Sequence, residues 1–193
     1  MRSQVWILSL ALSVSSSARL GGAGQTVKVV VADAPAVVIA DFSARVRAYV
    51  SLRKNVEDSF TVLRSSNDSA EIAAHKIELA AMIVSARSDA GQGDIFTPEI
   101  AMRFRDIIRM TFQSPGAQSV RRTVQDKDPA TPIVLRVNLA YPENSPLQMM
   151  PPTLLARLPD LPMDMGYRII GRALVLLDNK TRLIVDFIPA AVP

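Results

Sequence analysis

The strongest constraint on the fold is a series of short apolar segments near the C-terminus. Residues 167–170, 173–177 and 183–188 are rich in aliphatic and β-branched side chains, which favour strands. Gly171-Arg172 forms a two-residue link of the kind found in hairpins, and residues 178–181 (DNKT) are typical turn formers. The sequence therefore predicts a three-stranded antiparallel β-meander.

Both faces of this predicted sheet are apolar. In a strand that alternates strictly, the residues of the third segment divide into two sets, and Asp186 is the one polar member. One set is Leu183, Val185 and Phe187, and the other is Ile184, Asp186 and Ile188. Because a small sheet cannot leave two apolar faces in water, we expect it to pack against helices, against residues 133–140 as a further strand, or against a partner.

The first half of the chain carries helical patterns. Apolar residues recur every seven positions from Val37 to about Leu63, and Arg53 is an outlier in this stripe. Residues 65–68 (SSND) are turn formers, and Asp68 or Ser69 can cap a second helix, predicted from about Ser69 to Ala90. A short link between two long amphipathic helices predicts an antiparallel helical hairpin.

Two further helices are predicted before the composition changes. Thr97-Pro98-Glu99 combines an N-cap, a proline suited to the first turn and an acidic residue at the positive end of the helix dipole, so a helix is expected over Pro98–Phe112. A weaker helix is expected from Ser114 to about Gln125. After the linker at 126–132, most of the 13 prolines and the strand-like segments follow, with one helical turn at 153–158.

These patterns predict an α+β protein. An N-terminal helical hairpin or bundle of three to four helices is expected over residues 24–128, and a Pro-rich segment with the β-meander over residues 129–193.

The first 23 residues have the order of a secretory signal peptide. Arg2 is followed by an apolar run at residues 5–14 and then by small, polar residues. The run is too short to span a membrane, which takes about 20 apolar residues. Cleavage is expected after Ala23, and a site after Ala18 also fits. We therefore expect a periplasmic or secreted protein without a stable membrane anchor; the alternative interpretation of the run is a buried N-terminal helix.

Composition excludes several classes of function. The chain has no cysteine, which excludes disulfides, thiolate metal sites and a cysteine nucleophile. Removal of the leader would also remove Arg2 and Arg19, so the net charge of +4 would fall to +2. A charge this small gives no basis for nucleic-acid binding.

No residue is assigned a catalytic, cofactor-binding or metal-ligating role, although several belong to types that could carry one. His75 would have to be the base of a serine triad, but the chain has no G-x-S-x-G elbow, so a surface or boundary position is favoured. Asp186 could form a glycosidase-like carboxylate pair with a second aspartate, and the alternative is an edge-strand charge that blocks aggregation. The candidate second aspartates are Asp160, Asp164 and Asp178.

Methionines and arginines are further candidates for binding groups. A methionine cluster could bind Cu(I) through its thioethers, but flexible filling of the core is favoured; it comprises Met149, Met150, Met163 and Met165. The arginines of the third predicted helix could bind an anion, but they are expected to face solvent or to pair with Asp106; they are Arg103, Arg105 and Arg109.

Several stretches resemble a family of exported bacterial proteins of unknown function. They are GDIFTPE (93–99), RVNLAYP (136–142), PPTLLARLPDLP (151–162), YRIIGRALVLLD (167–178) and LIVDFIP (183–189). The last stretches are also loosely similar to the C-terminus of RcnB-like periplasmic proteins, without the histidines that metal binding would need. The resemblance implies a periplasmic module and brings no activity with it.

The sequence thus favours an exported, non-enzymatic interaction or structural module, whose partner would be another envelope protein or a second copy of itself. An envelope hydrolase that uses Asp186, and an envelope metal-stress protein, are the alternatives. No cofactor is expected.

Overall fold

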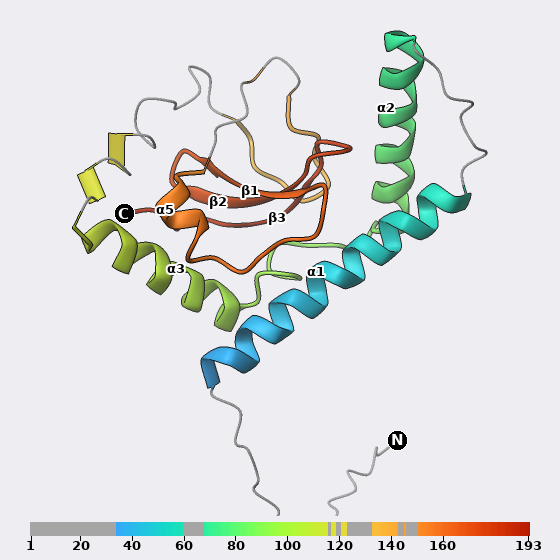
Figure 1. Ribbon diagram of the computed structural model, residues 1–193. Helices are drawn as coiled ribbons and strands as arrows, with labels where there is room; N and C mark the ends of the chain where they lie inside the picture. Colours follow the sequence, from blue (N-terminus) through green and yellow to red (C-terminus); the bar gives the residue numbers. More distant parts are fainter. Residues whose placement is uncertain are drawn as a thin grey trace, which may run out of the picture. The chain divides into compact units, whose positions relative to one another are not determined.

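The computed structural model describes residues 34–59, 68–115, 117–118, 121–122, 133–142, 145 and 150–193, all within one compact unit, Ala32–Pro193. Helices come first and a three-stranded sheet follows, so the α+β prediction is confirmed (Figure 1). Several predicted features lie outside the described residues. They are the signal peptide, Leu63, the linker at 126–132 and Met149.

Helix α1 (Ala34–Ser59) packs against both of the next two helices. Helix α2 (Ser69–Ala86) is capped by Asp68, one of the two predicted cap residues, whose side chain accepts a hydrogen bond from the Ala70 N–H. It ends before the predicted Ala90, because residues 87–89 form a turn. Part of the apolar stripe of α1 is buried, and the outlier Arg53 is buried with it. The buried apolar residues are Phe42, Val46 and Tyr49.

Helix α3 (Pro98–Gln113) matches its prediction closely. Thr97 accepts from the Ile100 N–H at the N-terminus, and an apolar face that includes Phe104 and Ile108 is buried. Residues 117–118 and 121–122 of the predicted fourth helix are helical. The short helix α5 (Pro152–Leu155) supplies the helical turn expected within the Pro-rich segment.

The sheet is the predicted antiparallel meander. Strands β1 (Met165–Ile170), β2 (Ala173–Asp178) and β3 (Ile184–Ile188) are hydrogen-bonded in the order β1-β2-β3. Gly171, in the two-residue turn between β1 and β2, has φ +56°, a left-handed conformation that glycine adopts without a steric cost.

A bulge in β3 changes which side chains face the helices. Leu177 pairs with Ile184 and Leu176 pairs with Asp186, so Val185 is an extra residue. Val185 and Ile188 therefore both join the helix-facing core, and Phe187 packs on the opposite face. The predicted alternation, which grouped Phe187 with Val185, is wrong because it assumed an unbroken strand.

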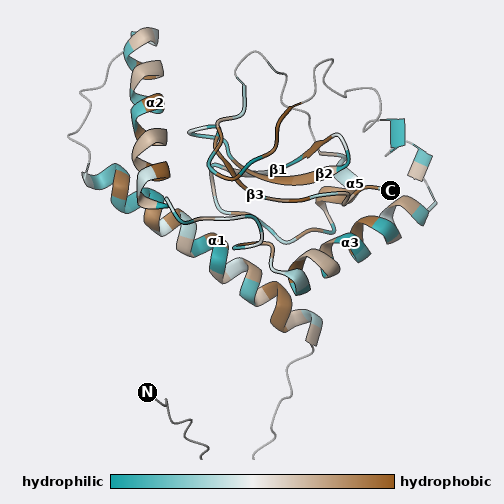
Figure 2. Ribbon diagram, turned by 180° about the vertical axis from the view of Figure 1, so that it is seen from behind, coloured by the Kyte–Doolittle hydropathy of each residue, from teal (hydrophilic) through white to brown (hydrophobic). Residues whose placement is uncertain are grey.

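Both faces of the sheet are covered, as their apolar character required. One face packs against α1, α3 and α5, around a cluster of aromatic rings with centroids 4.9 to 6.3 Å apart. These rings are Phe42, Phe96, Phe104 and Tyr167. The other face packs against residues 133–142, which include the buried Tyr141. Figure 2 shows the strands as predominantly hydrophobic.

The segment 133–140 is not a full strand. It forms a single bridge, between Ala140 and Leu183, although its backbone also hydrogen-bonds to Ile184. The cause is a turn at residues 137–138, where Asn138 has φ 64° and interrupts the extended conformation.

Candidate functional site

Helix α2 has two apolar stripes, and only one of them is fully buried; in the other, Ala80 and Val84 are half-buried against the core. Leu79 and Ile83 are fully buried against the rest of the unit. The second stripe recurs alternately every three and four residues, the spacing of side chains that meet a neighbouring helix. We call this stripe the α2 seam; it comprises Ala70, Ala73, Ile77, Ala80 and Val84. Its first part is open to solvent, and the Ile77 side chain is 67% exposed.

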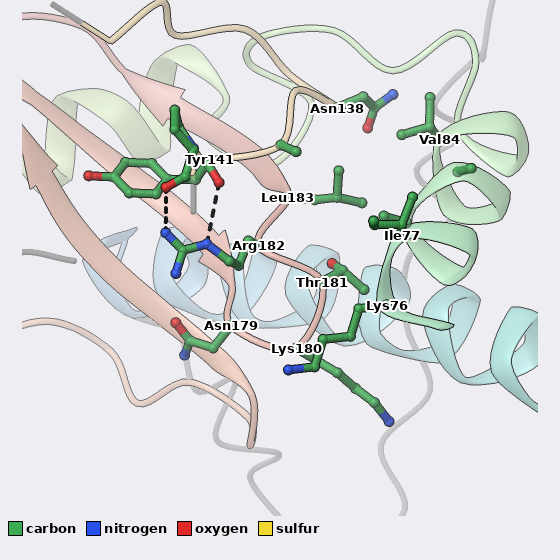
Figure 3. Close-up of a pocket in the computed structure, with 14 residues that line it drawn as sticks. Lys76, Ile77, Val84, Asn138, Tyr141, Asn179, Lys180, Thr181, Arg182 and Leu183 are labelled. Carbon is green, nitrogen blue, oxygen red and sulfur yellow. Dashed lines mark hydrogen bonds between the residues drawn. The ribbon is translucent and has the colours of Figure 1, made fainter. Parts of the chain in front are cut away.

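The C-terminal part of the seam forms one wall of a pocket of about 560 Å³ (Figure 3). The other walls are residues 138–142 and the turn between β2 and β3. Much of the lining is apolar, and it comes from all three segments. The apolar lining residues are Ile77, Ala80, Ala81, Val84, Ala140, Tyr141, Pro142 and Leu183.

The charged lining residues of the pocket are all cationic. They are Lys76, Lys180 and Arg182. Lys180 is hydrogen-bonded to Glu57 of α1, whereas Lys76 is exposed and has no ion pair within the described part of the chain. The Arg182 guanidinium donates to the carbonyl oxygens of Tyr141, Pro142 and Ser145, so its positive charge meets dipoles and no described carboxylate.

A buried hydroxyl lies in the same wall. Thr181 is only 6% exposed, and its Oγ1 has no hydrogen-bond partner among the described residues. A buried hydroxyl without a partner is unfavourable, so a polar ligand group nearby would relieve it. The neighbouring amides are already bonded: Asn138 pairs with Arg87 in both directions, and Asn179 accepts from Arg168.

Asp186 is a structural anchor for the loop before α3. The β3 bulge turns its side chain toward this loop, where it accepts backbone N–H bonds of 2.8 to 3.0 Å from Gly93, Ile95 and Phe96. A further bond of 2.8 Å comes from the Phe187 N–H. Asp186 is 0% exposed, so the interpretation of an exposed edge charge is wrong. Both oxygens of its carboxylate are occupied by donors from the chain itself.

Asp178 anchors the sheet to α1. Its carboxylate accepts from Tyr49 Oη at 2.7 Å and forms an ion pair with Arg53 at 3.1 Å, both beneath the surface. It also accepts from the backbone of its own turn, at Lys180 and Thr181. A buried charge is tolerated only when it is paired and hydrogen-bonded in this way.

The same cluster perturbs neighbouring ionisable groups. Burial, reinforced by the Asp178 carboxylate, raises the pKa of the Tyr49 phenol well above its ordinary value. Arg87 lies over the Tyr49 ring, 4.9 Å from its centroid, and burial lowers the pKa of this guanidinium. Tyr49 belongs to the core, and Arg87 is half-buried beside it.

The candidate carboxylates are only partly brought together. Asp164 lies 3.6 Å from the Arg53 guanidinium, which also holds Asp178. Asp160 instead lines a second pocket, of about 660 Å³, beside β1. No described hydrogen bond or ion pair joins Asp186 to any of these three, and it lines neither described pocket.

The other candidates occupy ordinary positions. His75 lies half-buried on α2. Met150 and Met165 fill the core, whereas Met163 is 86% exposed, so these three do not form one cluster. On α3, Arg109 pairs with Asp106 at 2.7 Å, as expected, and Arg105 donates to the Pro189 carbonyl. No group of three or more potential ligands that could hold a metal is found among the described residues.

Two features were not predicted, the Arg53–Asp178 ion pair and the α2 seam, although the sequence contains signals for both. Arg53 interrupts an apolar helical stripe, and Asp178 follows an apolar strand, so charges of opposite sign at core positions point to a buried ion pair. The α2 seam was visible as alanines at helical spacing, but its exposure depends on where the sheet packs.

Comparison with protein-family models, with curated proteins and with solved structures finds no match to this chain. Within the described residues, no helix combines the length and the apolar character needed to cross a membrane.

Proposed function

We propose that this protein is an exported, non-enzymatic binding module, and that the α2 seam is the surface through which it meets another envelope protein or a second copy of itself. The exposed seam is the observation that carries the proposal. It has the spacing of a helix-packing stripe, yet Ala70, Ala73 and Ile77 lie open to solvent.

The state of the acidic groups also supports binding over catalysis. A general acid or base must reach a substrate, but Asp178 and Asp186 are both 0% exposed and hydrogen-bonded by the chain itself. The export part of the proposal rests on the signal-peptide pattern of residues 1–23 and on the resemblance to exported bacterial proteins.

Photo-cross-linking in living cells tests the proposal. A cross-linking amino acid at Ala73 should yield a discrete adduct, whose partner or second copy is identified by mass spectrometry. The matched control is the same group at Glu78, which is also exposed on α2 but lies outside the seam. Adducts of equal yield from both positions, or none from Ala73, would contradict the proposal.

A charge in the seam provides a second test. Ala73→Glu should abolish the association of the protein with its partner or second copy, measured by sedimentation or co-purification. Because residue 73 is exposed, the circular dichroism spectrum should stay unchanged. If the association survives this substitution, the partner binds elsewhere.

A further inference from the structure

We infer that the pocket beside α2 binds a single-chain anionic amphiphile, that is, an alkyl chain with a carboxylate or phosphate head group. This inference rests on the proposal that the protein acts by binding. The ligand is additional to the partner proposed for the α2 seam.

The size and lining of the pocket suit an alkyl chain. Its volume of about 560 Å³ lies within the range of about 300–1,000 Å³ that is usual for small organic ligands. Ile77, Val84 and Leu183 form an aliphatic wall. The small side chains of Ala80 and Ala81 leave room beside the helix that larger residues would fill.

The charges select an anionic head group. Figure 3 shows Lys76 and Lys180 on one side of the pocket and Ile77, Val84 and Leu183 on another. No aspartate or glutamate lines this pocket. Behind its wall, Glu57 is bonded to the Lys180 ammonium, and the buried Asp178 carboxylate accepts from the backbone N–H groups of Lys180 and Thr181. An amphiphile could therefore place its chain on the aliphatic wall and its anion beside the two ammonium groups.

The unpartnered Thr181 hydroxyl is an independent observation in the same wall. Its oxygen is buried and lacks a partner among the described residues, although Thr181 lines the pocket. A head-group oxygen is an acceptor that this hydroxyl could reach after a small adjustment of the turn. A purely apolar ligand would leave the hydroxyl unsatisfied.

A small molecule fits these features better than an acidic protein segment. The pocket is bounded by three separate segments of the chain, α2, residues 138–142 and residues 179–183. A docking helix would instead need the open part of the seam, at Ala70 and Ala73, which does not line the pocket.

Calorimetric titration of the purified protein tests the inference. Octanoate, decanoate and dodecanoate should bind one per chain, each buried methylene tightening binding roughly fourfold until the pocket is full. Decyl phosphate distinguishes a phosphate from a carboxylate head group, and binding of either supports the inference. Decyltrimethylammonium, which has the same chain and the opposite charge, should bind at least tenfold more weakly.

Two variants place the ligand in this pocket. Lys76→Glu should weaken decanoate binding roughly fivefold to tenfold, whereas Arg47→Glu, the same change at an exposed site on α1 outside the pocket, should have no effect. Ala81→Phe should abolish decanoate binding, because the larger side chain would fill the cavity. Because residues 76 and 81 are exposed on α2, both variants should retain the wild-type thermal unfolding curve.

The inference would be overturned by no heat with any anionic alkyl ligand, by equal affinity for the cationic one, or by full binding to the Ala81→Phe variant. Binding of an acidic amphipathic peptide without any alkyl anion would also overturn it, in favour of a protein ligand. Each can occur while the Ala73 cross-link persists, so failure of this inference is distinguishable from failure of the proposed function.

Discussion

Substitution of Asp186 by asparagine should destabilise the protein severely, although the two side chains have nearly the same shape. One carboxylate oxygen accepts from Ile95 and Phe96, and the other accepts from Gly93 and Phe187. The amide of asparagine replaces one of these oxygens with a donor, which would then face backbone N–H groups.

The magnitude follows from the number of bonds that are lost. At least one charge-assisted bond is lost outright and the rest are weakened, and each such bond is worth about 1.5–3 kcal/mol. We therefore expect Asp186→Asn to lower the free energy of unfolding by about 3–5 kcal/mol, a large part of the roughly 5–15 kcal/mol that is usual for a domain. The loop at residues 93–96 should also become more susceptible to proteolysis.

Urea unfolding followed by circular dichroism at the helix band measures this loss, and the slope with urea should stay the same. The matched control is Asp89→Asn, an identical change at an exposed position, which should shift the free energy by no more than about 0.5 kcal/mol. A loss of less than about 1 kcal/mol for Asp186→Asn would refute the conclusion that Asp186 holds this loop.

Three further predictions concern the core and the turns. Arg53→Met should cost about 3–5 kcal/mol at pH 7, measured by urea unfolding, because it leaves the Asp178 carboxylate buried without its cation. Gly171→Ala should cost about 1–2 kcal/mol by the same assay, since φ +56° strains any residue with a Cβ, and a neutral effect would contradict the turn geometry. Burial raises the pKa of every tyrosine above its ordinary value, so absorbance at 295 nm should show less phenolate in the folded protein near pH 10 than in the unfolded chain; the tyrosines are Tyr49, Tyr141 and Tyr167. Because the unfolded chain releases these protons first, stability should fall above about pH 10, by about 1.4 kcal/mol per pH unit for each deeply buried tyrosine, and a stability that stays constant there would contradict the burial.

Local signals accounted for the elements that the sequence predicted well. Thr97-Pro98-Glu99 carries its own start signal for α3, and Gly171 marks the turn between β1 and β2, because each depends on adjacent residues. The β3 bulge and the turn at Asn138 depend instead on pairing with distant segments, so the alternation of side chains could not reveal them.

The role of Asp186 shows why the site was harder to predict than the fold. A charge inside an apolar strand signals a special position, but its partners are backbone N–H groups about ninety residues earlier, at Ile95 and Phe96, which no side-chain pattern reveals. The pocket beside α2 is lined by three segments that are distant in the chain, and only the packing of the folded protein brings them together.

Cysteine labelling in intact cells tests the central claim, that the α2 seam of an exported protein is a binding surface. The chain has no cysteine, so Ala73→Cys and Glu78→Cys each introduce one reporter. A maleimide that does not cross the inner membrane should label Glu78→Cys in intact cells and leave Ala73→Cys protected by its partner, while the purified variants react at similar rates. Equal labelling of both in cells would contradict a partner at the seam, and labelling of neither would contradict export.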